Sequence, residues 1–306
     1  MECLRLSVGI PAHNEEGNIG RVLEALLAQE LPSWLELEEI VVVASGCTDR
    51  TEDVVRDFGE RDERVKLVVE AERRGQTSAI NKLIRLARGD VVVFMCADTL
   101  PSRHALHELV SPMLSSPDVG AVVGRAMPLN DINTFWGFLA HLQYAWMYRP
   151  ELVAVDFESM TAIRRHLLKP VPEEVMAPEL YLDALVRAHG YRVVHAPRAL
   201  VFTKHPDNIW DYVEQKRRDT FHIMCLRQLG IRVRRRELRG LAALLMDGVR
   251  LTGLRASYRL ALASAIWAYC YLAALSDALL GRRKRYELWR PLRSTKKLAI
   301  GGGGLG

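Results

Sequence analysis

Short runs of β-branched residues alternate with helical patterns through the first 130 residues, and this alternation allows few architectures. The runs cover residues 6–12, 39–45, 65–71, 90–96 and 119–125, and each is apolar on both faces. Helical spacing of apolar residues fills residues 17–29, 48–59, 76–89 and 102–114. Such alternation predicts an α/β fold with a mostly parallel sheet flanked by helices. In sheets of this kind ligands bind at the carboxyl ends of the strands.

The pattern loosens after residue 130, and the composition changes near Arg232. We expect one catalytic domain over residues 1–231, with a nucleotide-binding half at about 1–129 and an acceptor half at about 130–231. Residues 232–300 are rich in Leu, Ala and Arg, and we expect them to form a basic, apolar helical appendage. The last six residues, GGGGLG at 301–306, are typical of a linker scar.

The cysteines and the N-terminus indicate a reducing compartment. Five cysteines are scattered along the chain without a CxxC pair, which argues against a disulfide framework and a zinc knuckle. The first apolar run is too short for the core of a signal peptide, so no N-terminal signal is expected.

Polar motifs follow the expected strands. They are PAHNEE (11–16), ASGCTDRT (44–51), RRGQTSAIN (73–81) and CADT (96–99), and later PELYLDALVRAHGYRV (178–193) and QKRRD (215–219). In this order and spacing they resemble the motifs of family 2 glycosyltransferases, over roughly residues 5–225. The resemblance implies the nucleotide-sugar-binding fold called GT-A and a sugar-transfer activity.

The first three motifs resemble the donor-binding segments of that family. The resemblance implies that Pro11, His13 and Glu15 line the nucleobase pocket. It places Ser45 where the family has a base- or ribose-binding carboxylate, and a hydroxyl cannot supply a charge-assisted bond there. Arg74 matches a basic donor-binding residue, with a solvated arginine as the alternative. An ordinary helix N-terminus capped by Asn14 also accounts for the PAHNEE turn.

CADT lies where the family has its metal-binding DxD signature, with Cys96 in the place of the first Asp. The resemblance implies that Asp98 binds a divalent cation, Mg²⁺ or Mn²⁺, which bridges the donor's two phosphates. A thiol is a poor ligand for so hard an ion, so Cys96 is expected to pack as a small hydrophobe. His205, in a later loop, is the candidate for a second metal ligand, and an ordinary loop residue is the alternative.

Glu179 stands where the family has its catalytic Asp. Transfer to a hydroxyl with inversion needs a base, and the resemblance implies this role for Glu179. Asp183, one helical turn later, is the alternative base. A carboxylate that merely complements a helix dipole after Pro178 explains the same residue without catalysis.

QKRRD resembles the family's QxxRW motif, with Asp219 in the place of the Trp. The resemblance implies that Gln215 binds the donor and that Arg218, with Lys216 or Arg217, stabilises the diphosphate leaving group. Processive polymer synthases use that Trp to hold the growing chain, so its absence favours transfer of a single sugar. A basic, solvated helix face is the alternative.

The C-terminal appendage combines an apolar segment with basic flanks. Residues 260–281 approach the length of a membrane span, but Asp277 interrupts them. Clusters at 232–239 and 282–297 carry much of the net charge of +5, so a single span would place them on opposite sides of a membrane. We expect a hairpin or an interfacial helix, with packing against the catalytic domain or a second subunit as the alternative. No recognised nucleic-acid motif accompanies the charge, so no nucleic-acid partner is expected.

Together these features predict an inverting glycosyltransferase at the cytoplasmic face of a membrane, peripheral or hairpin-anchored. It would move one sugar from a nucleotide-sugar donor to a hydroxyl of a lipid or lipid-linked acceptor. One alternative is transfer to polyprenyl phosphate, and another is a degenerate, non-catalytic nucleotide-sugar binder. A dehydrogenase is disfavoured because no GxGxxG follows the first strand.

Overall fold

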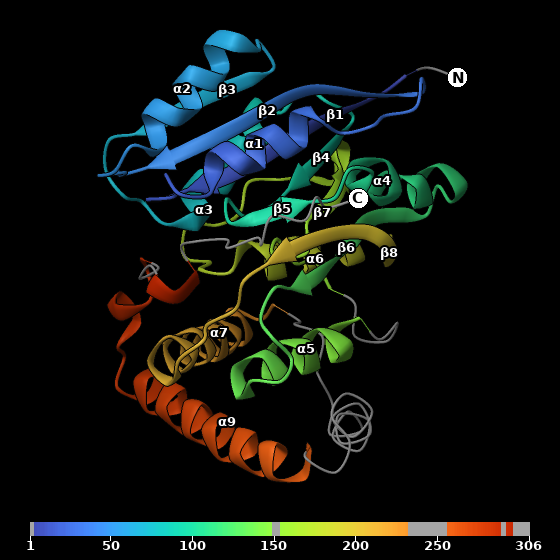
Figure 1. The fold of residues 1–306 in the computed structure, drawn as a ribbon. Coiled ribbons are helices and arrows are strands. Elements are labelled where there is room, and N and C mark those ends of the chain that lie inside the picture. Colours follow the sequence, from blue (N-terminus) through green and yellow to red (C-terminus); the bar gives the residue numbers. More distant parts are fainter. Residues whose placement is uncertain (1–2, 149–153, 232–255, 289–291, 296–306) are drawn as a thin grey trace.

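The computed structural model of the chain describes residues 3–148, 154–231, 256–288 and 292–295. An eight-stranded sheet in the order β3-β2-β1-β4-β7-β6-β8-β5 forms its centre (Figure 1). The strands are β1 (Leu4–Ala12), β2 (Leu35–Ser45), β3 (Val65–Glu70), β4 (Val91–Phe94), β5 (Thr99–Pro101), β6 (Val119–Pro128), β7 (Thr161–Arg164) and β8 (Arg192–Thr203). The α-helices are α1 (Ile19–Leu27), α2 (Thr51–Arg61), α3 (Gln76–Leu86), α4 (Ala105–Ser115), α5 (Phe135–Met147), α6 (Pro178–Ala188), α7 (Ile209–Gln228) and α9 (Ala256–Leu279). The predicted α/β class with a mostly parallel, helix-flanked sheet is confirmed.

The strands β1, β2 and β4 are largely buried on both faces, which is why they contain continuous apolar runs, whereas the edge strand β3 exposes Val69. In β4, Val91 and Val93 belong to the core that includes α1 and α4. Val92 and Phe94 point the other way, into the core that includes α3 and α6. Side chains alternate across a strand, so VVVF supplies both layers at once.

The second half of the sheet contains strands that the sequence did not reveal. β7 has four residues and runs antiparallel to β4, with Thr161 opposite Phe94. β8 contains Pro197, and its register with β6 shifts between Val123 and Arg125, so the chain around the proline leaves the ladder. Proline in a strand is tolerated at such irregularities, but it masks the strand in the sequence.

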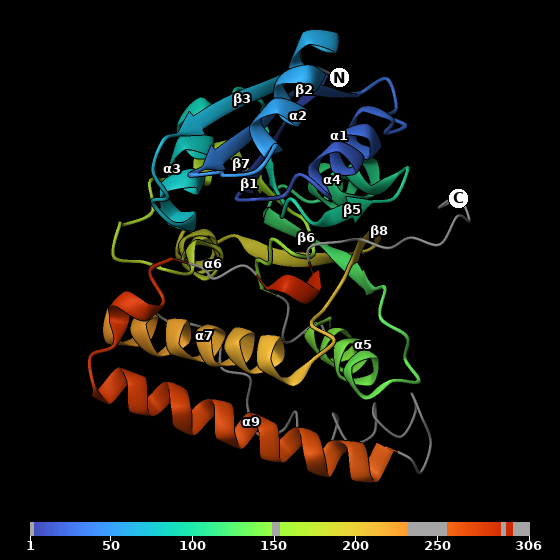
Figure 2. The same cartoon turned by 60° about the vertical axis from the view of Figure 1, so that its left-hand side comes forward.

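Three helices form a layer below the sheet, in which α7 lies between the sheet and α9 in both views (Figures 1 and 2). Apolar side chains of α5, α7 and α9 pack together there, among them Phe138, Tyr212 and Leu260. The Trp267 indole of α9 donates to the Tyr212 hydroxyl at 2.7 Å. Asp277 of α9 is fully buried and accepts from Arg217 Nε of α7 at 2.7 Å. The helix α9 is therefore attached to α5 and α7 along much of its length.

The outer face of α9 is apolar and carries no charge from Tyr258 to Gly281. Its large exposed side chains are Tyr258, Leu262, Tyr269, Tyr271, Leu272, Leu279 and Leu280. Residues Tyr258–Leu279 are long and apolar enough to cross a membrane by length and composition alone, and 28% of the most apolar stretch is buried in the protein. The two charged residues of Tyr258–Leu279, Arg259 and Asp277, are buried on the face that packs against the protein.

Several sequence expectations concern residues outside the described part of the chain. They are the basic cluster at 232–239, the domain boundary at 231/232, residues 289–291 and 296–297 of the second basic cluster, and the proposed linker scar at 301–306. These expectations, including the division into domains, stay predictions.

Candidate active site

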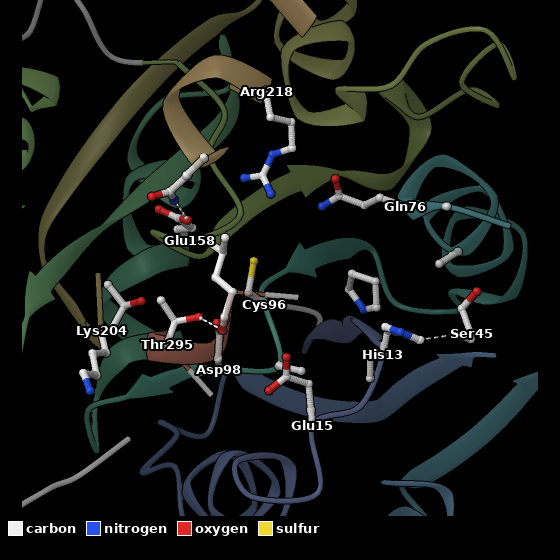
Figure 3. Close-up of a pocket in the computed structure, with 18 of the residues that line it drawn as sticks. His13, Glu15, Ser45, Gln76, Cys96, Asp98, Glu158, Lys204, Arg218 and Thr295 are labelled. Atoms are coloured by element: carbon white, nitrogen blue, oxygen red, sulfur yellow. Dashed lines mark hydrogen bonds between the residues drawn. The ribbon is translucent and has the colours of Figure 1, made fainter. Parts of the chain in front are cut away.

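The carboxyl ends of three neighbouring parallel strands meet at one edge of the sheet. Ala12 of β1 lies opposite Ala44 of β2, and Gly9 lies opposite Phe94 of β4. The loops after these strands enclose a cavity, which we call the donor cavity (Figure 3). It is lined by Pro11, Ala12, His13, Glu15, Ser45, Arg73, Gly75, Gln76, Ala79, Cys96, Ala97, Asp98, Glu158, Thr203, Lys204, His205, Gln215, Arg218, Leu292 and Thr295. All the predicted donor-binding and metal-binding residues except Arg74 are among them.

One wall of the donor cavity is built from the PAHNEE turn and the end of β2. The Nδ1 of His13 donates to the Ser45 carbonyl at 2.8 Å, which fixes the ring across the strand ends (Figure 3). Glu15 is nearly buried and accepts from Asn18 Nδ2 at 2.9 Å. Asn14 does not cap α1, because its amide group bonds to Thr48 and the helix begins later, at Ile19.

The loop before α3 contributes Arg73 to the cavity rather than Arg74. Arg74 contacts this wall through its backbone N–H, which donates to Ser45 Oγ at 3.3 Å. Gly46 has φ of +56°, and a Cβ there would lie 2.7 Å from the Arg73 nitrogen. The close approach of these two loops therefore depends on glycine at position 46.

Acidic side chains gather around Cys96 at the opposite wall. Burial, and then the nearby Asp98 and Glu158, hold the pKa of the Cys96 thiol well above its usual range. The thiol is therefore neutral and makes a poor metal ligand. Burial, followed by the charge of Asp156, raises the pKa of Glu158 to about 8. Glu158 was not among the predicted site residues, although VDFESM (155–160) places two acids just before TAIRR.

His205 lies beside this acidic wall and is almost fully buried. Its Nε2 is 2.8 Å from the Tyr144 hydroxyl and 4.0 Å from Glu158 Oε2. Burial, and then Lys216, lower the pKa of His205 to about 3, so the imidazole is neutral. A neutral imidazole is the form that can bind a metal.

The side chains at this wall fit a hard divalent cation whose coordination is completed by a bound ligand. Asp98 and Glu158 offer carboxylate oxygens, which Mg²⁺ and Mn²⁺ prefer, and His205 offers a nitrogen. Among the described residues, no three His, Cys, Asp or Glu side chains are arranged to hold a metal by themselves. The phosphates of a nucleotide would have to complete the coordination.

A second cavity, which we call the acceptor cavity, adjoins the first. Its lining residues are Gln76, Cys96, Val123, Gln143, Met147, Tyr148, Ala154, Val155, Asp156, Phe157, Glu158, Ala177, Glu179, Leu180, Asp183, Gln215, Lys216, Arg218, Asp219, Thr220, His222, Ile223 and Arg227. Gln76, Cys96, Glu158, Gln215 and Arg218 line both cavities. A molecule in one cavity can therefore meet a molecule in the other at these residues.

Glu179 belongs to the acceptor cavity alone. It lies in the first turn of α6, directly after Pro178. Its Oε2 is buried and has no hydrogen-bond partner among the described residues. Burial raises the pKa of Glu179 to about 8, with the negative charges of Asp156 and Asp219 adding to the effect. Such a carboxyl group exchanges its proton near neutral pH, as a general base requires.

Asp183, the alternative base, is occupied by structural contacts. Its Oδ2 accepts from Arg187 Nε at 2.9 Å, and its Oδ1 accepts from the Val155 N–H at 3.1 Å. This carboxylate is therefore used to pair an arginine and to hold the loop before β7.

The basic residues of α7 point in different directions. Arg218 lines both cavities, is nearly buried, and points into the donor cavity (Figure 3). It bonds to Asp219 at 3.2 Å. Gln215 donates to Glu158 Oε1 at 3.4 Å. Arg217 bonds instead to Asp277 of α9, on the far side of the helix from the cavities, which leaves Lys216 as the second cation of this motif in the acceptor cavity.

The chain returns to the donor cavity after α9, which the sequence did not indicate. Leu292 and Thr295 line the cavity, and Figure 3 shows Thr295 beside Asp98. Ser294 between them donates its N–H and its hydroxyl to Asp211 of α7, at 2.9 and 2.6 Å. A segment of the basic, apolar appendage, for which packing against the rest of the chain was the alternative, therefore contributes to the wall of the site.

Comparisons with known proteins agree with this geometry. A family model described as glycosyl transferase family 2 matches residues 7–171, and one described as glycosyl transferase family group 2 matches residues 179–286. The probable glycosyltransferase YdaM of Bacillus subtilis is 28% identical over 225 residues, which cover 68% of this chain and 53% of YdaM. The chain spans about half the length of the first curated relatives that it matches.

Solved structures share the fold. A mannosyltransferase from Pyrobaculum calidifontis, in complex with GDP-Man and Mn²⁺, is similar with a TM-score of 0.65 and 25% identity. The similarity covers 92% of this chain and 89% of that one. Glucosyl-3-phosphoglycerate synthase from Mycobacterium tuberculosis is similar in fold, with a TM-score of 0.51, 21% identity, and coverage of 75% and 81%.

The raised pKa of Glu179 predicts a pH-dependent effect on stability. The folded protein holds this proton more tightly than the unfolded chain does, so stability is lost as pH rises from about 4.5 towards 8. Glu179→Gln cannot ionise and should therefore raise the melting temperature relative to wild type at pH 9, and much less at pH 5. The gain should be roughly 2–4 °C for each kcal/mol relieved, measured by calorimetry. Glu173→Gln, at an exposed position nearby, is the control, and an equal effect of Glu179→Gln at both pH values would contradict the assignment.

Proposed function

The chain belongs to glycosyl transferase family 2, and we propose that it moves a single sugar from a nucleotide-sugar donor to a hydroxyl group with inversion at the anomeric carbon. The observation that carries the proposal is the position of Glu179. Its buried Oε2 has no hydrogen-bond partner in the part of the chain that the structure describes. Glu179 lines the acceptor cavity, which adjoins the donor cavity, but does not line the donor cavity itself. A base placed beside an acceptor, and apart from the donor, suits attack by a hydroxyl.

In the proposed reaction the hydroxyl oxygen of the acceptor attacks the anomeric carbon while Glu179 takes the hydroxyl proton. The bond between that carbon and the diphosphate oxygen breaks, and the electron pair leaves with the diphosphate. Arg218 lines both cavities and is placed to stabilise the charge that develops there. Gln215 orients the neighbouring Glu158 through its amide.

We propose that a divalent cation, Mg²⁺ or Mn²⁺, binds with the donor at Asp98 and His205, with Glu158 beside them. The Pyrobaculum mannosyltransferase was solved with GDP-Man and Mn²⁺, which supports a nucleotide-sugar donor and such an ion here. When bound, the cation would neutralise the diphosphate. The surrounding acids supply the negative potential that attracts it.

We further propose that the acceptor is lipid or lipid-linked and that the outer face of α9 lies on the cytoplasmic face of a membrane. Support comes from the uncharged outer face of this helix and from the exposed Arg282 and Lys284 that follow it. Because α9 packs on α7 through buried charges, a peripheral helix fits better than a spanning one. All five cysteines are free, which suits a reducing compartment. A second copy of the chain on this face is the alternative.

Two other functions make different demands on the site. Polyprenyl phosphate attacks through an oxygen that is already ionised and needs no base, so it would leave Glu179 without a role. A non-catalytic nucleotide-sugar binder would need neither Glu179 nor the acceptor cavity. The arrangement of Glu179 therefore favours transfer to a hydroxyl over both.

Substitution of Glu179 tests the reaction. Glu179→Gln keeps the size of the side chain but removes the base, so transfer should fall by roughly 10²–10⁴-fold. Donor affinity should stay close to wild type, because Glu179 does not line the donor cavity. Transfer is followed by mass spectrometry and donor binding by calorimetry. If a folded Asp183→Asn protein loses transfer while Glu179→Gln keeps it, the base is Asp183, and if both keep it, the acceptor is a phosphate.

Substitution of Asp98 tests the metal. Asp98→Ala should abolish the increase in donor affinity that Mg²⁺ or Mn²⁺ gives to the wild type, because it removes the carboxylate that follows Cys96 and Ala97 at the cavity wall. Calorimetric titration with the donor, with and without EDTA, measures the effect. Asp53→Ala, at an exposed site on α2, is the control. An unchanged response to EDTA in Asp98→Ala would remove Asp98 from the metal site.

Charges on α9 test the membrane surface. Leu262→Glu with Leu272→Glu places two carboxylates on the outer face, and flotation with vesicles that contain anionic phosphatidylglycerol should be lost. Leu114→Glu with Leu86→Glu adds the same charge at exposed sites on α4 and α3 and should leave flotation unchanged. A wild type that fails to float at low salt would refute the membrane proposal. If sedimentation then shows a dimer that the α9 variants disrupt, the partner is a second copy.

A further inference from the structure

A buried carboxylate lies beside Ser45, at the wall of the donor cavity. Glu70 ends β3, and the register of β2 with β3 pairs it with Ser45. Paired residues of neighbouring strands point to the same face of a sheet, so the Ser45 hydroxyl and the Glu70 carboxylate are neighbours. Glu70 is 3% exposed and does not line the cavity, whereas Ser45 does. A ligand in the cavity can therefore feel Glu70 through Ser45.

Glu70 is ionised despite its burial. Ser78 Oγ donates to Glu70 Oε1 at 2.7 Å, and Lys82 Nζ lies 3.1 Å from the same oxygen. Burial alone would raise the pKa of Glu70, but Ser45, Ser78 and Lys82 together hold it below its usual value. Among the described residues Oε2 of Glu70 has no hydrogen-bond partner, so the nearby Ser45 hydroxyl acts on this pKa without closing a full hydrogen bond. One oxygen of the carboxylate is therefore satisfied, and the other can still accept.

The Ser45 hydroxyl has one proton to donate and two positions that accept. The backbone N–H of Arg74 occupies one accepting position, at 3.3 Å. If the proton turned into the cavity, the charged and buried Oε2 of Glu70 would stay without a donor, which is costly. If the proton turns to Glu70, the second accepting position of Ser45 Oγ is left for a ligand. The carboxylate therefore favours Ser45 as a hydrogen-bond acceptor towards the cavity.

Ser45 lies at the end of the donor cavity away from the proposed metal site. Figure 3 shows His13 between Ser45 and Asp98. The base of a nucleotide is at the opposite end from its phosphates, so a donor whose diphosphate meets Asp98 brings its base towards Ser45. Uracil, thymine and guanine carry a ring N–H on their hydrogen-bonding edge, whereas cytosine and adenine carry an accepting ring nitrogen there. A Ser45 that accepts fits the first group of bases.

We propose that Glu70 is a positioning residue for the donor's base, which holds the Ser45 hydroxyl as an acceptor and so selects a base with a ring N–H over cytosine or adenine. This inference rests on the proposed nucleotide-sugar donor. Position 45 lacks the carboxylate that the family resemblance places there. In the proposed arrangement the negative charge acts on the base from the neighbouring strand instead, through one hydroxyl.

Two matched pairs of nucleotides test the selection on the full chain with Mn²⁺ at neutral pH. They are UDP with CDP, and GDP with ADP, and within each pair chiefly the hydrogen-bonding edge of the base differs. We expect the N–H-bearing member of at least one pair to bind roughly tenfold more tightly, the value of one hydrogen bond. Calorimetry measures the affinities. Equal affinities within both pairs would overturn the inference.

Glu70→Gln tests the role of the carboxylate. The amide oxygen of the new side chain must face Lys82, so its NH₂ group faces Ser45 and donates to that hydroxyl. The Ser45 proton then turns into the cavity, and the affinity ratio within the preferred pair should fall roughly tenfold. Glu70→Asp keeps the charge but shortens its reach, and should also reduce the ratio. A folded variant of either kind that keeps the wild-type ratio would contradict the role of Glu70.

A purely structural role for Glu70 would weaken the binding of both nucleotides alike. When Ser45→Ala is already present, Glu70→Gln should no longer change the ratio, because the hydroxyl that Glu70 positions is gone. Glu39→Gln is the matched control and should leave the ratio unchanged, since Glu39 is also buried on the sheet, pairs with Lys66 at 2.5 Å and lines neither cavity.

Two outcomes of these measurements separate this inference from the function on which it rests. A further fall of the ratio when Glu70→Gln is added to Ser45→Ala would overturn the inference and leave a nucleotide-sugar transferase. If none of the four nucleotides bound with Mn²⁺, the proposed function would be wrong, and this inference with it.

Discussion

The antiparallel pairing of β4 with β7 brings together residues that line both cavities. Because Thr161 lies opposite Phe94, the chain that leaves β4 meets the chain that enters β7, and Cys96 and Glu158 line the same walls. The rings of Phe94 and Phe157 stack with their centroids 5.2 Å apart, which stabilises the approach of these two segments. A shift of the register by one residue would turn every side chain of β7 to the opposite face. Both the donor wall and the acceptor wall therefore depend on four residues of strand.

This junction also accounts for the cysteine in CADT. Asp98, Asp156, Glu158 and Glu179 all contribute to the raised pKa of the Cys96 thiol, so four carboxyl groups already surround position 96. A fifth carboxylate there would raise the pKa values of its neighbours further. A neutral thiol keeps the negative potential that attracts a cation without adding to the repulsion. In the proposed metal site, Glu158 of the loop before β7 would supply the carboxylate that the loop after β4 lacks.

The sequence predicted the parts of the site that local pattern controls. The alternation of residues 6–125 gave β1 to β4, β6 and the helices between them, and the motifs placed Pro11, His13, Ser45 and Asp98 at one edge of the sheet. Glu158 and Thr295 were not predicted as site residues. Their positions depend on the four-residue strand β7 and on the return of the chain after α9, and neither produces a periodic pattern in the sequence. The direction of Arg217 was hidden in the same way, since only the packing of α9 decides which of three adjacent basic residues faces the cavities.

Asp277 has a consequence for how this protein can vary among its relatives. Its buried carboxylate binds Arg217, Arg282 and the Tyr286 hydroxyl, so it joins α7, α9 and the segment that leads back to the donor cavity. Loss of Asp277 would leave the largely buried Arg217 and Tyr286 without this partner, and such changes persist only when they occur together. The outer face of α9 carries no such constraint. Related chains should therefore drift freely among apolar residues on one side of this helix, while positions 217, 277 and 286 covary as a group.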